Sequence, residues 1–162
     1  MEKIFNNLMS NALKFTPQGG KISVGFDVID REKAARLFGL SADGRITQYV
    51  KVSVANTGQS IPEDKIEKIF ERYYQIGNQA EGTYNWGTGI GLYYARSLAV
   101  LHHGQLKASQ SEEGSGAVFT FVLPVNDAAY AEDERATEQS NQSEAFPLCL
   151  LYTSDAADEA RS

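Results

Sequence analysis

The chain has 162 residues, enough for one domain with a hydrophobic core and a tail. Its net charge of −6 and the lack of a concentrated basic patch exclude a nucleic-acid-binding surface. With no run of about 18 apolar residues and no signal-peptide pattern, we expect neither a membrane span nor a secretion signal. A single cysteine, Cys149, excludes an internal disulfide and a multi-cysteine zinc site. The cytoplasm is the compartment that fits best.

The first predicted element is an amphipathic helix over residues 2–15. Apolar residues form one broad face of this helix, and Asn7, Asn11 and Lys14 fall together opposite it. Asparagine is a mediocre helix former, so an ordered polar stripe of this kind is unusual for a helix face that only contacts solvent. An ordinary solvated helix face is the alternative interpretation of this stripe. An amide oxygen can ligate Mg²⁺, and a nearby lysine can reach the phosphates bound to that ion. The stripe therefore predicts a metal–phosphate site.

The remaining elements are read from alternating apolar residues, helical periodicity and turn residues. In the first half they are a strand over 21–28 with Ile22, Val24 and Phe26 on one face, a polar insertion over 30–47 with a short helix around 32–40, and a strand over 50–55. In the second half, a capping box at 60–63 opens a helix with its apolar face at Ile66, Ile69, Phe70 and Tyr73. A further helix follows residues 87–92 and runs to His103, and strands over 106–110 and 117–123 form a hairpin. Segregated helices and hairpins predict an α+β fold, a two-layer α/β sandwich.

A glycine run, Gly87-Thr88-Gly89-Ile90-Gly91-Leu92, precedes the last predicted helix. Alternate glycines let backbone N–H groups approach phosphate, and a helix N-terminus offers unpaired donors and partial positive charge. No Lys-Ser/Thr pair follows, as a P-loop requires, and no strand comes directly before, as a dinucleotide fold requires. A flexible loop before a helix is the alternative for this run alone.

Four blocks in one order resemble a known family. They read NLMSNALKFT at residues 7–16, NTG at 56–58, IFERYY at 69–74 and GTGIGL at 87–92. This order resembles the N, G1, F and G2 boxes of the ATP-binding catalytic domain of sensor histidine kinases, within the GHKL (HATPase_c) superfamily that includes gyrase and MutL. Residues 93–104 look most like hybrid two-component regulators of Bacteroidetes. The resemblance implies the Bergerat ATP-binding fold, with a mixed, mostly antiparallel sheet and helices on one face.

The resemblance also implies roles for the matching residues, with ATP and Mg²⁺ as cofactors. Asn11 would ligate Mg²⁺, Lys14 would contact phosphate, and Phe15 would lie against the adenine. Asn7 stands where ATP-hydrolysing relatives have a glutamate that activates water. Because an amide cannot act as that base, Asn7 is consistent with phosphoryl transfer to a protein. The other implied nucleotide contacts are Asn56, Gly58, Arg72, Gly87, Thr88, Gly89, Gly91 and Leu92, with residues 74–88 as a lid.

The chain departs from the family pattern at three places. Asn56 replaces an aspartate that accepts a hydrogen bond from the adenine amino group, a bond that an amide oxygen can still accept. Ser60 replaces the second glycine of the G1 box, where a helix-capping serine is a sound substitute. The lid contains no Lys or Arg, so the basic contact to the γ-phosphate is absent or supplied by Arg72.

These residues predict the catalytic domain of a two-component kinase, which transfers the ATP γ-phosphate to a histidine on a separate dimerisation domain. A response regulator receiver domain would be the next partner, and the fragment would belong to the cytoplasmic part of a membrane-bound sensor without touching the membrane itself. The alternatives are a non-catalytic ATP-sensing module and a self-contained ATPase of the GHKL type. His102 and His103 close the last helix, where a structural role is the expectation rather than phosphate acceptance.

The expected domain covers residues 1–125. Compared with the family it begins within its first helix, with the opening strand missing, so exposed apolar sheet surface and low stability are expected. Without an acceptor hairpin the fragment alone is expected to be inactive. Residues 126–162 read as a disordered linker and tail, and the end of the tail looks like translated sequencing-adaptor sequence.

Overall fold

The computed structural model describes residues 1–40, 45–76, 89–111 and 115–125, so the predicted tail lies outside the described part. The helices are α1 (Glu2–Phe15), α2 (Arg31–Phe38) and α3 (Gly91–Leu101), with short 3₁₀ helices η1 (Glu63–Lys65) and η2 (Lys68–Phe70). The strands are β1 (Ile22–Asp30), β2 (Gln48–Asn56), β3 (Gln105–Gln110) and β4 (Ala117–Pro124). None of the helices in the described ranges has the length and apolar character needed to span a membrane.

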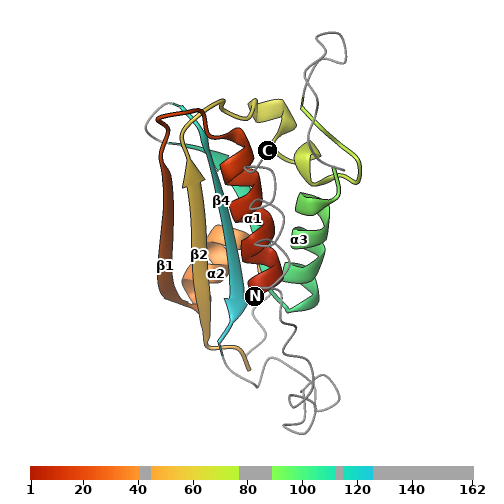
Figure 1. Cartoon of the computed structure of the whole chain (residues 1–162). Coiled ribbons are helices and arrows are strands. Elements are labelled where there is room, and N and C mark those ends of the chain that lie inside the picture. Colours follow the sequence, from red (N-terminus) through yellow and green to blue (C-terminus); the bar gives the residue numbers. More distant parts are fainter. Residues whose placement is uncertain (41–44, 77–88, 112–114, 126–162) are drawn as a thin grey trace, which may run out of the picture. The chain divides into compact units, whose positions relative to one another are not determined.

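Across the described residues, the strands form a four-stranded sheet in the order β1-β2-β4-β3. Every pair of neighbours is antiparallel, with Val52 of β2 opposite Phe26 of β1 and Phe121 of β4. Figure 1 shows α1 and α3 side by side on one side of this sheet. The predicted two-layer α+β fold is confirmed. In the described part the sheet contains antiparallel pairs alone.

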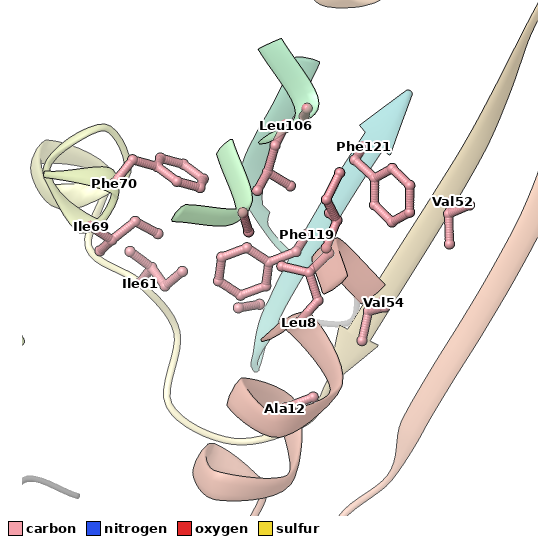
Figure 2. Close-up of a cluster of buried hydrophobic side chains, with 14 of the residues drawn as sticks. Leu8, Ala12, Val52, Val54, Ile61, Ile69, Phe70, Leu106, Phe119 and Phe121 are labelled. Atoms are coloured by element: carbon pink, nitrogen blue, oxygen red, sulfur yellow. The ribbon is translucent and has the colours of Figure 1, made fainter. Parts of the chain in front are cut away.

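The main core lies between the sheet and the helices α1 and α3 (Figure 2). One residue per turn of α1 is fully buried, at Ile4, Leu8 and Ala12. These side chains meet alternate residues of the central strands, since successive residues of a strand point to opposite faces. The core also contains Val52, Val54, Ile61, Ile69, Phe70, Ala95, Ala99, Leu106, Phe119 and Phe121. Most of the apolar face predicted for the first helix therefore packs in or against the core, whereas Leu13 of that predicted face is exposed.

A second cluster of buried residues involves the insertion between β1 and β2. Ala34 and Phe38 of α2 pack with Ile29, Tyr49 and Val122. In the strand register Tyr49 and Val122 alternate with core residues of the main cluster, so α2 covers part of the opposite face. The two-layer prediction, with helices on one face, did not include this addition.

The helix predicted to begin at residues 60–63 is wrong. The segment forms η1 and η2 instead, and the N-cap of η1 is Pro62, without a side-chain capping bond. Ser60 does not form the capping box because its Oγ accepts a hydrogen bond from the N–H of Gly116 at 3.1 Å. In this arrangement η2 places both Ile69 and Phe70 in the core (Figure 2).

The other predicted elements are present, with ends that differ by a few residues. The glycine-entered helix α3 starts at Gly91 and ends at Leu101, before the predicted end at His103. His103 has φ of 57°, which is incompatible with continuing a right-handed helix. Strands β1 and β2 extend two residues further than predicted at the ends joined to the insertion.

An exposed apolar strip runs along β1. Val24, Phe26 and Val28 expose 39%, 68% and 59% of their surface, although Phe26 contacts Phe5 of α1 with ring centroids 6.4 Å apart. The sequence pattern places apolar residues on one face of this strand, and part of that face is exposed at the edge of the sheet.

The core predicts unequal effects for two leucines of α1. Leu8→Ala should cost about 2–5 kcal/mol of unfolding free energy, because Leu8 is fully buried and its truncation leaves a cavity. Leu13→Ala is the matched control and should change stability by less than about 0.5 kcal/mol, because Leu13 is 66% exposed. Urea denaturation of both variants measures the difference, and equal losses would contradict the described packing of α1.

Candidate functional site

A cavity of about 270 Å³ opens between α1, the segment after β2, the start of β4 and the start of α3. This volume is just below the range of about 300–1,000 Å³ that is usual for ligand pockets. Asn7, Asn11 and Lys14 of α1 lie along one wall, and Gly89, Gly91 and Leu92 lie on another. The cavity thus brings the polar stripe and the end of the glycine run together.

Asn7 lies beside the start of α3. Its Nδ2 donates a hydrogen bond to the carbonyl oxygen of Lys3 at 2.8 Å. A Cβ built on Gly91 would lie only 2.9 Å from Asn7 Oδ1, so a side chain at position 91 would displace this amide. Gly91 therefore allows the N-terminus of α3 to reach the cavity beside α1, where its backbone donors suit an anion.

Lys14 and Phe15 form the C-terminal end of the α1 wall. The Nζ of Lys14 lies 4.9 Å from the centroid of the Phe15 ring. Burial lowers the pKa of the Lys14 ammonium group, since partial removal from water disfavours the charged form. An anionic group bound in the cavity would offset that desolvation and favour the charged form. Lys14 therefore suits a phosphate group.

Elsewhere the cavity combines the polar side chain of Asn56 with an apolar wall. Asn56 is the buried polar residue in the described part, with 5% exposure, and its Nδ2 donates to the carbonyl oxygen of Thr57 at 3.1 Å. Ile61, Ile69 and Phe119 line the cavity near it and belong to the main core (Figure 2). An amide held between apolar side chains suits a planar heterocycle with polar edges.

The backbones of Tyr73 and Gly89 are in direct contact. The N–H of Tyr73 donates to the carbonyl oxygen of Gly89 at 2.9 Å, and both residues have positive φ, 67° and 68°. A Cβ on Gly89 would lie 2.8 Å from the carbonyl carbon of Tyr73. This backbone contact fixes the spacing between η2 and α3 on one side of the cavity.

The remaining predicted site residues are placed differently. Phe15 lines the cavity, whereas Gly58 packs behind it, against the carbonyl oxygen of Phe15. Arg72 stacks on the Tyr93 ring at 4.9 Å and is not among the described residues that line the cavity. Gly87 and Thr88, with most of the predicted lid, lie outside the described residues.

Sequence reasoning missed several cavity residues. They are Ser10, Gln59, Ile61, Ile69, Ala117 and Phe119, whereas the lining residues Tyr74, Gln75 and Ile76 belong to the predicted lid. Ile69 and Phe119 were assigned to a helix face and a strand, and nothing local in the sequence shows that these positions also border a cavity. Ser10 lies next to Asn11 and one helical turn before Lys14 on α1, and this position beside the stripe was the available signal.

Residues 1–127 match the family model described as histidine kinase-, DNA gyrase B- and HSP90-like ATPase. The chain belongs to this family. The HATPase_c match covers every described residue, including all the cavity walls.

Several relatives of this HATPase_c chain are sensor histidine kinases. It is 32% identical to the sensor histidine kinase TmoS of Ectopseudomonas mendocina over 142 residues, 86% of this chain and 13% of TmoS. It is 33% identical to the sensor histidine kinase WalK of Bacillus subtilis over 122 residues, 75% of this chain and 17% of WalK. The chain therefore spans less than a fifth of the length of these two relatives.

The HATPase_c fold is also similar to solved kinase structures. Full-length ShkA in complex with AMPPNP is similar to this chain with a TM-score of 0.52 and 28% identity, over 75% of this chain and 20% of ShkA. The ATP analogue in that structure agrees with the ATP-binding character of the family.

Two glycines with the same backbone angle allow a matched test of the contact at Tyr73. Gly39 and Gly89 both have φ of 68°, but a Cβ on Gly39 would meet nothing within 4 Å. Gly39→Ala should cost roughly 1–2 kcal/mol from left-handed strain alone. Gly89→Ala should cost at least about 1 kcal/mol more, because its methyl group also collides with the Tyr73 backbone. Thermal denaturation compares the two variants, and an equal loss would show that the Tyr73–Gly89 contact is not maintained.

Proposed function

We propose that this domain binds Mg·ATP in the cavity and delivers the γ-phosphate to a histidine of a separate dimerisation domain. The observation that carries the proposal is the combination of two kinds of lining in one cavity. Asn11 and Lys14 line it together with the N-terminus of α3, and Asn56 lines it together with apolar side chains of the main core. A polyphosphate and a purine require these two environments, joined in one cavity.

Each wall has a chemical task in this proposal. The Asn11 amide oxygen is a suitable Mg²⁺ ligand, and the Lys14 ammonium group and the backbone N–H groups at Gly91 supply positive charge for the phosphates. Phosphoryl transfer needs mainly positioning and charge neutralisation. Asn7 has no basic atom that could activate water, which favours transfer to a protein acceptor over ATP hydrolysis.

The domain needs partners for this reaction. The sensor histidine kinases it resembles are several times longer than this chain. We propose that the parent protein supplies the phosphoacceptor histidine and that a response regulator receiver domain takes the phosphate next.

Incubation with γ-labelled ATP tests whether a separate dimerisation domain, and not this chain, accepts the phosphate. The chain alone should stay unlabelled, and a supplied dimerisation domain with its acceptor histidine should gain an acid-labile phosphate. ATP binding without labelling of the acceptor would favour a non-catalytic ATP-sensing module. Acid-labile label on this chain, lost on replacing His102 or His103, would contradict the proposed transfer to a partner.

Asn11→Ala should weaken Mg·ATP binding far more than binding of adenosine, because it removes the proposed metal ligand and leaves the base end intact. Asn6→Ala is the matched control, since Asn6 is an exposed asparagine of the same helix and does not line the cavity. Isothermal titration calorimetry with both ligands measures the two losses. A similar loss for Mg·ATP and adenosine would exclude Asn11 as the metal ligand.

Asn56→Leu should remove the preference for ATP over GTP, because a buried adenine amino group without an acceptor costs about 1–3 kcal/mol. Asn56→Asp should keep that preference, since a carboxylate also accepts the hydrogen bond. Competition binding with the two nucleotides gives the ratio of affinities. An unchanged ratio in the leucine variant would show that another residue recognises the base.

A further inference from the structure

The end of the β3–β4 hairpin is tied to the segment that follows Asn56 by two side-chain hydrogen bonds. Ser60 Oγ accepts from the N–H of Gly116 at 3.1 Å. Gln110 Nε2 donates to the carbonyl oxygen of Ile61 at 3.0 Å. Gln110 ends β3 and Gly116 immediately precedes β4, so one hairpin end holds both bonds.

The same hairpin end also fits closely against the backbone of Asn56. Gly116 has φ of +117°, and a Cβ built on it would collide with the carbonyl oxygen of Asn56. The next residue, Ala117, is the register partner of Asn56 in the β2–β4 ladder. Asn56 and Ala117 both line the cavity. The hairpin therefore sets the position of the polar group at this end.

Residues 57–62 connect β2 to η1 without regular secondary structure. Three consecutive residues of this segment, Gln59, Ser60 and Ile61, line the cavity. Because no helix or sheet ladder fixes them, their position depends on bonds from other elements. Both hydrogen bonds are made to residues of this run, from Gly116 to Ser60 and from Gln110 to Ile61.

We propose that Ser60 and Gln110 are positioning residues that set purine-base discrimination by holding residues 56–61 against the β3–β4 hairpin. The inference rests on the proposed nucleotide function. Gln110 is not among the described residues that line the cavity, so it acts through Ile61 and not by contact with a nucleotide. The two bonds hold the Asn56 amide and the Ile61 side chain at a fixed spacing, and loosening either bond widens the base end.

The test compares binding of ATP and inosine triphosphate, which carries an oxygen in place of the adenine amino group, to the whole chain by calorimetry. Ser60→Ala and Gln110→Met each remove one bond. Each should lower the preference for ATP over inosine triphosphate by about threefold to tenfold, the range expected for one hydrogen bond. Ser60→Thr keeps the hydroxyl and should keep the preference. Ser97→Ala is the control, because Ser97 also uses its hydroxyl in a hydrogen bond, to the Tyr93 carbonyl oxygen on exposed helix surface.

The outcomes separate this inference from the proposed function. Equal weakening of both nucleotides, or an unchanged preference, in Ser60→Ala and Gln110→Met would overturn the positioning role, because a purely structural effect does not discriminate between bases. Gln110 is exposed, so its variant provides the test even where Ser60→Ala folds poorly. A wild-type chain without preference for ATP over inosine triphosphate would instead contradict the proposed base recognition by Asn56.

Discussion

Burial of the apolar stripe of α1 is the constraint on which the site depends. Ile4, Leu8 and Ala12 are inside the core, and this fixes the rotation of the helix about its axis. Asn11 and Lys14 then have to face the cavity, since a helix places residues three or four apart on one side. Among the described residues, hydrophobic packing of α1, and not a network of polar bonds, therefore orients the polar stripe toward the cavity.

The opposite walls of the cavity are held by close backbone approaches. Gly91 lets α3 approach Asn7, and Gly89 contacts the Tyr73 backbone. At the base end, the β3–β4 hairpin meets the Asn56 backbone at Gly116. Each wall comes from a different part of the sequence, so the cavity exists only once the sheet has assembled. Its shape consequently depends on tertiary contacts more than on any single motif.

The sequence predicted those parts of the fold that depend on periodicity. The apolar repeat of α1 and the alternation in the strands need only local information, and the family resemblance supplied the order of the motifs. The segment from Ser60 to Phe70 was predicted incorrectly because Ser60 bonds to Gly116, a partner far along the chain. Arg72 illustrates the same limit, since its stacking on Tyr93 depends on how η2 meets α3. Roles of individual residues in nucleotide binding stay predictions.

Binding of the nucleotide in the cavity between α1, β2 and α3 can be followed through amide chemical shifts, recorded during titration of the ¹⁵N-labelled chain with Mg·AMPPNP. Binding in this cavity should give saturable shifts at Asn11, Asn56 and Gly91, and little change at Ala34 and Tyr49 on the opposite face of the sheet. Saturable shifts centred on that opposite face, or none at the cavity residues, would contradict it.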